Sequence, residues 1–181
     1  MILASKLKKT NIVEYLLHMW QIEDLIRACM FNMDTLEKKL FANYQFKDEY
    51  ERKTVYEWYE SLIEMMRIEN VQEKGHLQIN KNVIIELNDF HFRLFSSAKE
   101  PGYNAKYVYV MPMINQLRMK SEAGLSDIEL CFNFQYIYML LKIKKTTISA
   151  DTQHTQQEIS KYLVLLSKHY HAYQDGKLDL E

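Results

Sequence analysis

Four ionisable residues of this chain fall where helical spacing predicts apolar side chains. The helical period places Glu23 on the same face as Met19 and Ile26, and it places His91 beside Leu87. A buried charge must be paired or neutralised, so we expect these side chains to satisfy one another inside the protein. The other two are Glu69, which continues the stripe of Leu62, Met65 and Met66, and Arg118, which shares a face with Tyr107, Met111 and Ile114. The Arg118 guanidinium is the expected partner of Glu23 or Glu69, because it can bind a carboxylate through two hydrogen bonds.

A second polar group lies in the segment EKGHLQINKN, residues 73–82. We expect Gly75 to take the left-handed conformation that ends the preceding helix. His76 and Gln78 would then bond the free carbonyls at that end, while Asn80 or Asn82 caps the next helix. Capping explains every polar residue here, so we interpret the segment as a joint between helices rather than as a working site.

Three kinds of chemistry suit these residues. The leading interpretation is a buried hydrogen-bond and salt-bridge network that fixes the register of the helices. A metal or hydrolytic acid–base site would need further ligands that the spacing does not place. The remaining alternative is a small-ligand pocket in a helical bundle, formed by Glu23, Glu69, His91 and Arg118 with His76 and Gln78 at its mouth.

Sequence motifs exclude several activities. Glu-x-x-His occurs once, at Glu73 to His76, and Gly75 interrupts the helix that would present it. No glycine-rich phosphate loop and no HExxH motif is present. Residues 114–133 could form a helix-turn-helix, but residues 127–141 contain two acids and no Lys or Arg for the major groove. We therefore expect no cofactor, no bound metal and no nucleic-acid partner.

The composition favours a helical cytoplasmic protein. Among 181 residues there are 4 glycines and 2 prolines, where average usage predicts roughly 13 and 9. Lys plus Arg is 23 and Asp plus Glu is 24, so the net charge of −1 offers no basic footprint. Cys29 and Cys131 lie singly in apolar stretches and are interpreted as buried, reduced thiols. No signal-peptide core or membrane-spanning run is found, so we expect no membrane association.

Helix start and stop signals recur along the chain. Asn11, Asp34 and Ser126 each precede an acid by three residues, as N-caps do. Segment 126–145 is apolar almost all the way round, which is typical of a helix at the centre of a bundle. The sequence predicts one all-α domain over residues 1–181, with six or seven helices near 11–30, 34–43, 48–74, 81–97, 103–121, 126–145 and 152–173.

The chain also resembles a known family. The segments YLLHMWQIEDLIRA, WYESLIEMMRIENVQEKGHLQINKNVIIELNDFHFRLF and IELCFNFQYIYMLLKIKK are similar to an uncharacterised all-helical family from Bacteroidetes. The resemblance implies a single helical domain in a cytoplasmic bacterial protein, and it transfers no functional residues. We predict a non-catalytic interaction or scaffold protein that binds an unknown protein partner or associates with itself as a homodimer.

Overall fold

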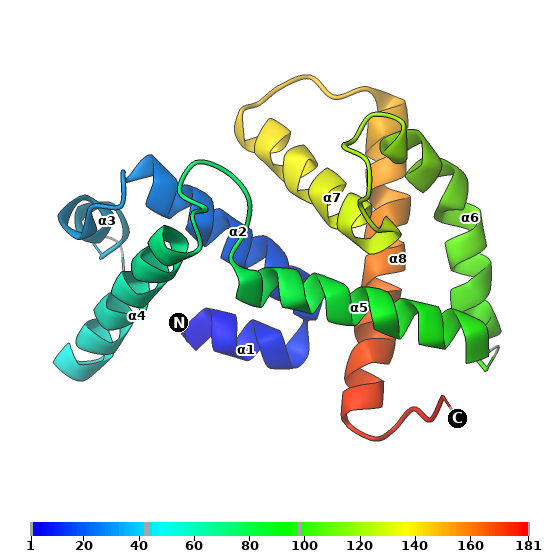
Figure 1. Ribbon diagram of the computed structural model, residues 1–181, viewed down its shortest axis with the longest axis horizontal. Helices are drawn as coiled ribbons and strands as arrows, with labels where there is room; N and C mark the ends of the chain where they lie inside the picture. Colours follow the sequence, from blue (N-terminus) through cyan, green and yellow to red (C-terminus); the bar gives the residue numbers. More distant parts are fainter. Residues whose placement is uncertain (1, 42–43, 98, 181) are drawn as a thin grey trace. The chain divides into compact units, whose positions relative to one another are not determined.

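Eight α-helices make up the described part of the chain, which covers residues 2–41, 44–97 and 99–180 of a computed structural model and contains no strand (Figure 1). The all-α prediction is confirmed, but the expected number of helices is wrong because α1 was not predicted. Only Asn11 separates α1 from the helix that follows. The helices are α1 (Ile2–Thr10), α2 (Ile12–Ala28), α3 (Met33–Leu40), α4 (Glu49–Ile68), α5 (Gln78–Ser97), α6 (Pro101–Arg118), α7 (Asp127–Ile143) and α8 (Ala150–Gln174).

The helix starts follow the N-cap signals in part. The Ser126 hydroxyl accepts the Glu129 N–H at 3.1 Å and begins α7, as predicted. The cap of α3 is Asn32 instead of Asp34, and its side chain accepts the Thr35 N–H at 2.8 Å. The helix expected near 34–43 ends at Leu40, and residues 42 and 43 lie outside the described part of the chain.

The contacts divide the chain into two compact units. Unit 1 consists of Met1–Lys8 and Glu14–Asn82, and unit 2 consists of Lys9–Val13 and Val83–Glu181. In unit 1, α3 contacts α4, and the core holds fully buried side chains from three helices. These include Leu16, Met19 and Ile26 of α2, Leu36 of α3, and Met66 of α4. The single domain expected over 1–181 stays a prediction.

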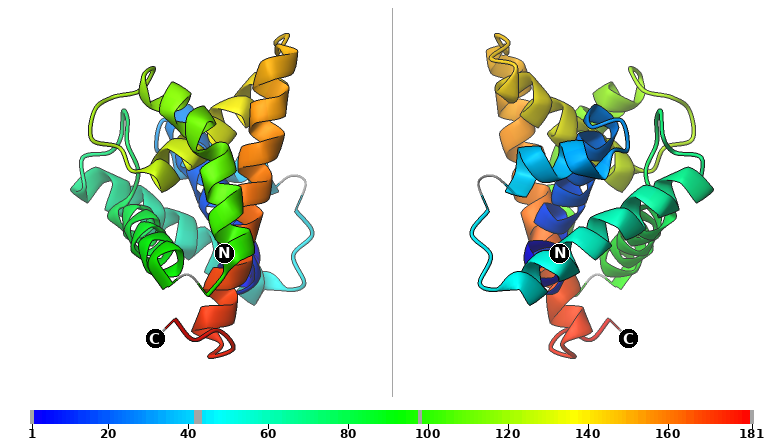
Figure 2. Two further views of the ribbon diagram at one scale, coloured as in Figure 1. Left: turned by 90° about the vertical axis from the view of Figure 1, so that its right-hand side faces the viewer. Right: turned by 90° about the vertical axis from the view of Figure 1, so that its left-hand side faces the viewer.

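In unit 2, α6, α7 and α8 all contact one another, so the central place of residues 126–145 stays a prediction. Helix α8 contacts both α6 and α7, and its long axis can be followed in Figure 1 and Figure 2. Its buried side chains recur every three or four residues from Glu158 to Tyr170. Helix α7 is buried only over Ile128–Tyr136, and beyond that Ile137 and Ile143 are 55% and 68% exposed.

Helix α6 includes the segment YVYVM, residues 107–111, within the helix expected near 103–121. Pro101 occupies its first turn, where a missing N–H costs nothing, and Pro112 lies inside the helix. Within the described residues, no helix combines the length and the apolar character that a membrane span requires.

Candidate functional site

The buried carboxylate of Glu23 is the centre of a polar cluster in unit 1. Periodicity places Glu23 inside, and its side chain is completely buried, as predicted. Its Oε1 atom accepts the Leu77 N–H at 3.0 Å and the Asn80 Nδ2–H at 2.7 Å, and its Oε2 atom lies 2.6 Å from His76 Nδ1. Three donors around two oxygens suit an ionised carboxylate, which explains how the charge is tolerated in the core.

His76 is held in one orientation by two contacts. Its Nδ1 atom faces Glu23, and its ring stacks on Trp20 with a centroid distance of 4.0 Å and an interplanar angle of 11°. The side chain is 28% exposed, and Nε2 has no protein partner among the described residues. A carboxylate that accepts Nδ1–H leaves Nε2 as the basic, ligating nitrogen. The geometry therefore presents one oriented imidazole nitrogen to solvent.

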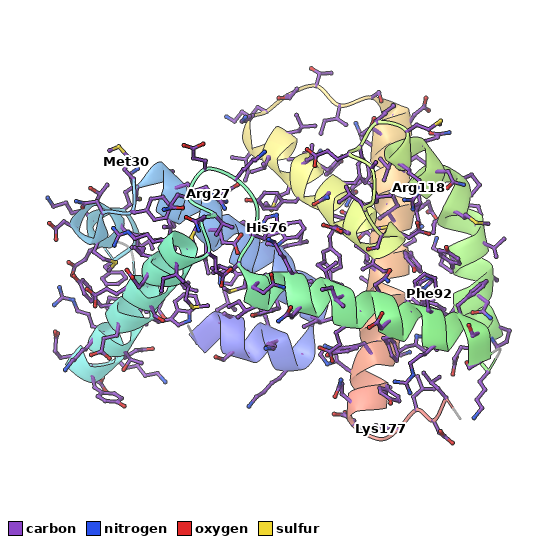
Figure 3. The ribbon with its side chains drawn as sticks, in the orientation of Figure 1. Arg27, Met30, His76, Phe92, Arg118 and Lys177 are labelled. Atoms are coloured by element: carbon purple, nitrogen blue, oxygen red, sulfur yellow. The ribbon has the colours of Figure 1, made fainter. Side chains whose placement is uncertain are left out.

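Arg27 fastens the segment that carries His76. Its guanidinium donates to the Val71 and Gly75 carbonyls at 3.0 and 2.5 Å and pairs with Asp24 at 2.7 Å. Gly75 has φ +87°, so the left-handed conformation was predicted correctly, but the preceding helix α4 already ends at Ile68. The left-handed residue that ends α4 is Asn70, with φ +55°. Arg27 and His76 are both labelled in Figure 3.

Glu69 and Gln78 form a second contact at the start of α5. The prediction that Glu69 faces the core is wrong, because it is the half-exposed C-cap of α4. Its carboxylate accepts the Gln78 N–H at 2.6 Å, while the Gln78 side chain donates to Asn82 at 2.8 Å. Neither His76 nor Gln78 bonds the free carbonyls of α4, and neither Asn80 nor Asn82 caps α5, which begins at Gln78.

Both carboxylates serve the same helix terminus. Glu23 accepts the N–H of Leu77 and Glu69 accepts the N–H of Gln78, so two negative charges meet the positive end of α5. This arrangement joins the end of α4, the loop over residues 69–77 and the start of α5 to α2. These contacts anchor the start of α5, and His76 Nε2 is a partly exposed atom that can bind a ligand.

His91 lies in unit 2 inside a group of tyrosines. It is 1% exposed, as its place on an apolar face predicted. Its Nδ1 atom lies 2.7 Å from the Tyr103 hydroxyl and 3.0 Å from the Tyr162 hydroxyl, which are 3.1 Å apart. Burial lowers the pKa of His91 to about 4 and raises the pKa of both tyrosines. The imidazole is therefore neutral, and its Nδ1 atom is hydrogen-bonded to the tyrosine hydroxyls.

Arg118 does not face the core, so that prediction is wrong. Its side chain is 43% exposed at the end of α6, where it pairs with Asp127 and donates to the Leu125 carbonyl at 2.8 Å (Figure 3). Tyr107 also donates to Asp127, at 2.6 Å. Arg118 closes the turn between α6 and α7, and its carboxylate partner is neither Glu23 nor Glu69.

The structure therefore brings the six predicted residues into two pairs and two separate contacts. Glu23 pairs with His76, and Glu69 pairs with Gln78, all in unit 1, whereas His91 and Arg118 have their partners in unit 2. Within the described ranges, no group of three or more His, Cys, Asp or Glu side chains could hold a metal ion.

Three residues of the cluster were not predicted from the sequence. Trp20 and Arg27 stand three residues before and four residues after Glu23, so helical spacing could have placed them on its face. Asn80 was assigned only as a cap. Its donation to Glu23 depends on the path of the loop over residues 69–77, which no local pattern reveals.

Comparison with known proteins places the chain in a family without giving it an activity. Residues 1–177 match the family described as "Domain of unknown function (DUF4924)", so the chain belongs to that family. The match agrees with the resemblance to an uncharacterised family. No curated protein and no solved structure matches the chain significantly.

Proposed function

We propose that this protein is a non-catalytic interaction protein that forms a homodimer through α6. The observation that carries the proposal is an uncharged stretch of eleven residues, 107–117, in a helix with an exposed face. A helix that faces only solvent normally carries charges on that face. One row of exposed side chains at helical spacing comprises Val108 (51% exposed), Met111 (38%), Pro112, Asn115 and Met119 (79%).

A second copy of the chain is the occupant that suits this face. A charged partner would lose hydration and find no opposite charge here, whereas a two-fold axis would place residues 107–117 against the same uncharged stretch of the second copy. Pro112 supplies no N–H, so the Val108 carbonyl lacks its usual helical donor and is available to accept one across the interface.

The size of the face predicts a weak dimer. The eleven steps from Val108 to Met119 cover about 17 Å of helix at ~1.5 Å per residue. Such a stripe buries less than the roughly 800 Å² per partner of a standard stable interface. The dimer should therefore form and dissociate with protein concentration.

Sedimentation velocity over a hundredfold range of concentration tests this proposal. The wild-type chain should shift from monomer towards dimer, and Val108→Glu should remain monomeric with an unchanged melting temperature. Val164→Glu is the matched control, because Val164 on α8 is 57% exposed and receives the same charge. A wild-type monomer at every concentration, or a dimer that survives Val108→Glu, would refute the proposal.

We further propose that the protein acts in the bacterial cytoplasm. Cys29 and Cys131 are both buried and form no disulfide. Reduced thiols of this kind persist in the reducing compartment.

A second candidate function, small-ligand or metal binding that includes a hydrolytic role, has one supporting observation. His76 Nε2 is accessible and oriented by Glu23, as in ligating histidines. A thermal-shift screen with divalent metals and metabolites should then give a hit that His76→Gln abolishes and that exposed His154→Gln leaves intact. A screen without hits would remove this candidate and leave the dimer proposal untouched.

A further inference from the structure

An open pocket of about 400 Å³ lies within unit 2, whereas the polar cluster around Glu23 belongs to unit 1. Its walls come from the residues just before α2 and from the C-terminal part of α8. The volume falls in the range of small-molecule sites. The polar residues that line it include Thr10, Asn11, Ser167, Lys168, His171 and Lys177.

Ser167 offers the pocket an unused hydrogen-bonding group. The residue is only 5% exposed, and its hydroxyl bonds no other group in the described ranges. A serine or threonine within a helix can turn its hydroxyl to the carbonyl four residues earlier, as Thr54 of α4 does to Tyr50 at 2.8 Å. The hydroxyl oxygen is not one of the fully buried atoms without a partner, so it remains accessible from the pocket. A ligand acceptor in the pocket would supply the missing bond.

The charge around the pocket is positive. Lys9, directly before Thr10, and Lys168, in the pocket wall, have no acidic partner in the described part of the chain. Lys177 pairs with Asp175 at 2.7 Å. Among the residues that line the pocket, Lys168 and Lys177 therefore stand against the single carboxylate of Asp175, which favours an anion over a cation.

His171 links the start of α2 to the wall of the same pocket. Its Nε2 atom accepts the Ile12 N–H at 3.2 Å, so the first amide of this 17-residue helix is bonded by a side chain of the pocket wall. The N-terminus of a helix carries a partial positive charge that stabilises nearby anions. The backbone thus adds to the field of the lysines.

From these four observations we propose that the pocket between the start of α2 and the end of α8 binds a small anionic molecule through a phosphate or carboxylate group. Ser167 donates its hydroxyl hydrogen to an oxygen of the anion, and Lys168 supplies the opposite charge. The proposal does not depend on dimer formation through α6, and each can fail while the other stands.

Titration of the full chain with inorganic phosphate and, separately, with acetate tests this proposal. Backbone amide signals of Ile12, Ser167 and His171 should shift and saturate in NMR spectra at constant ionic strength, and the anion that saturates identifies the group. Ser167→Ala and Lys168→Gln should each weaken binding about tenfold. Because the Ser167 hydroxyl bonds nothing in the protein, Ser167→Ala should fold with an unchanged melting temperature.

Lys144→Gln is the matched control, since it removes an exposed lysine that follows α7 and lines no part of this pocket. It should leave the titration unchanged. The proposal is overturned if neither anion gives saturable shifts, or if Lys144→Gln weakens binding as much as Lys168→Gln does.

Discussion

Acid should destabilise unit 2 through His91, and the magnitude follows from its burial. The pKa of His91 is about 4 in the folded protein, against 6.5 for an exposed histidine. A lowered histidine pKa means that the unfolded chain binds more protons below 6.5, so stability is lost as the pH falls from 6.5 towards 4. Between about pH 7 and pH 5 the two pKa values correspond to a loss of roughly 2 kcal/mol in the free energy of unfolding.

The groups that face His91 do not reverse this sign. Tyr103 and Tyr107 of α6 and Tyr162 of α8 are neutral throughout this range, because burial raises the pKa of each. Asp127 of α7 raises the pKa of His91, but less than burial lowers it. The pKa of the neighbouring Cys131 thiol is also raised by burial, so it stays neutral.

Urea unfolding followed by far-ultraviolet circular dichroism measures the effect in the wild type and in His91→Gln. Other histidines, including His18 and His171, also have lowered pKa values and contribute to both proteins equally. The difference between the two stability profiles therefore isolates His91. The variant should be less stable at about pH 7 but should lose roughly 2 kcal/mol less on going to about pH 5. Parallel profiles would refute the reasoning.

Three further substitutions test other parts of the structure. Glu23→Gln removes the charge from three buried donor contacts and should cost roughly 2–3 kcal/mol of stability, with a change in Trp20 fluorescence as urea unfolds the protein. Gly75→Ala should lower the free energy of unfolding by about 1 kcal/mol, because alanine disfavours a φ of +87°. The added Cβ would meet only Val71 Cγ1, at an ordinary 3.7 Å, so the cost comes from the backbone. An unchanged stability in urea would contradict the left-handed conformation. Lys145→Gly should gain about 0.5–1 kcal/mol, because a lysine at φ +54° follows α7, and calorimetry should show a higher melting temperature.

Helical periodicity identified the buried charges only where the helix continued beyond them. Glu23 and His91 lie well inside α2 and α5, so their faces were predicted correctly. Glu69 and Arg118 lie at helix ends, where the chain turns away and a position on the helical wheel no longer defines a face. Helical periodicity assigns a residue to a face only where the helix continues, and capping signals locate the helix ends only to within a few residues.

The partner of Glu23 and the burial of residues 126–145 both depended on tertiary structure. Glu23 pairs with His76, which is 53 residues away along the chain, and no spacing rule relates the two. The apolar character of residues 126–145 indicated burial on all sides, yet Ile137 and Ile143 remain exposed. The hydrophobicity of a helix shows how much surface it could bury, but the arrangement of the neighbouring helices decides how much of that surface is covered.

The chain carries one buried cysteine in each unit, Cys29 in unit 1 and Cys131 in unit 2, and both are inaccessible to solvent. A small alkylating reagent can reach either sulfur only during a transient opening of the surrounding helices. Mass spectrometry of the two tryptic peptides would thus measure the alkylation rate of each cysteine, and hence the rate of opening around it in unit 1 and in unit 2 separately, without any introduced label.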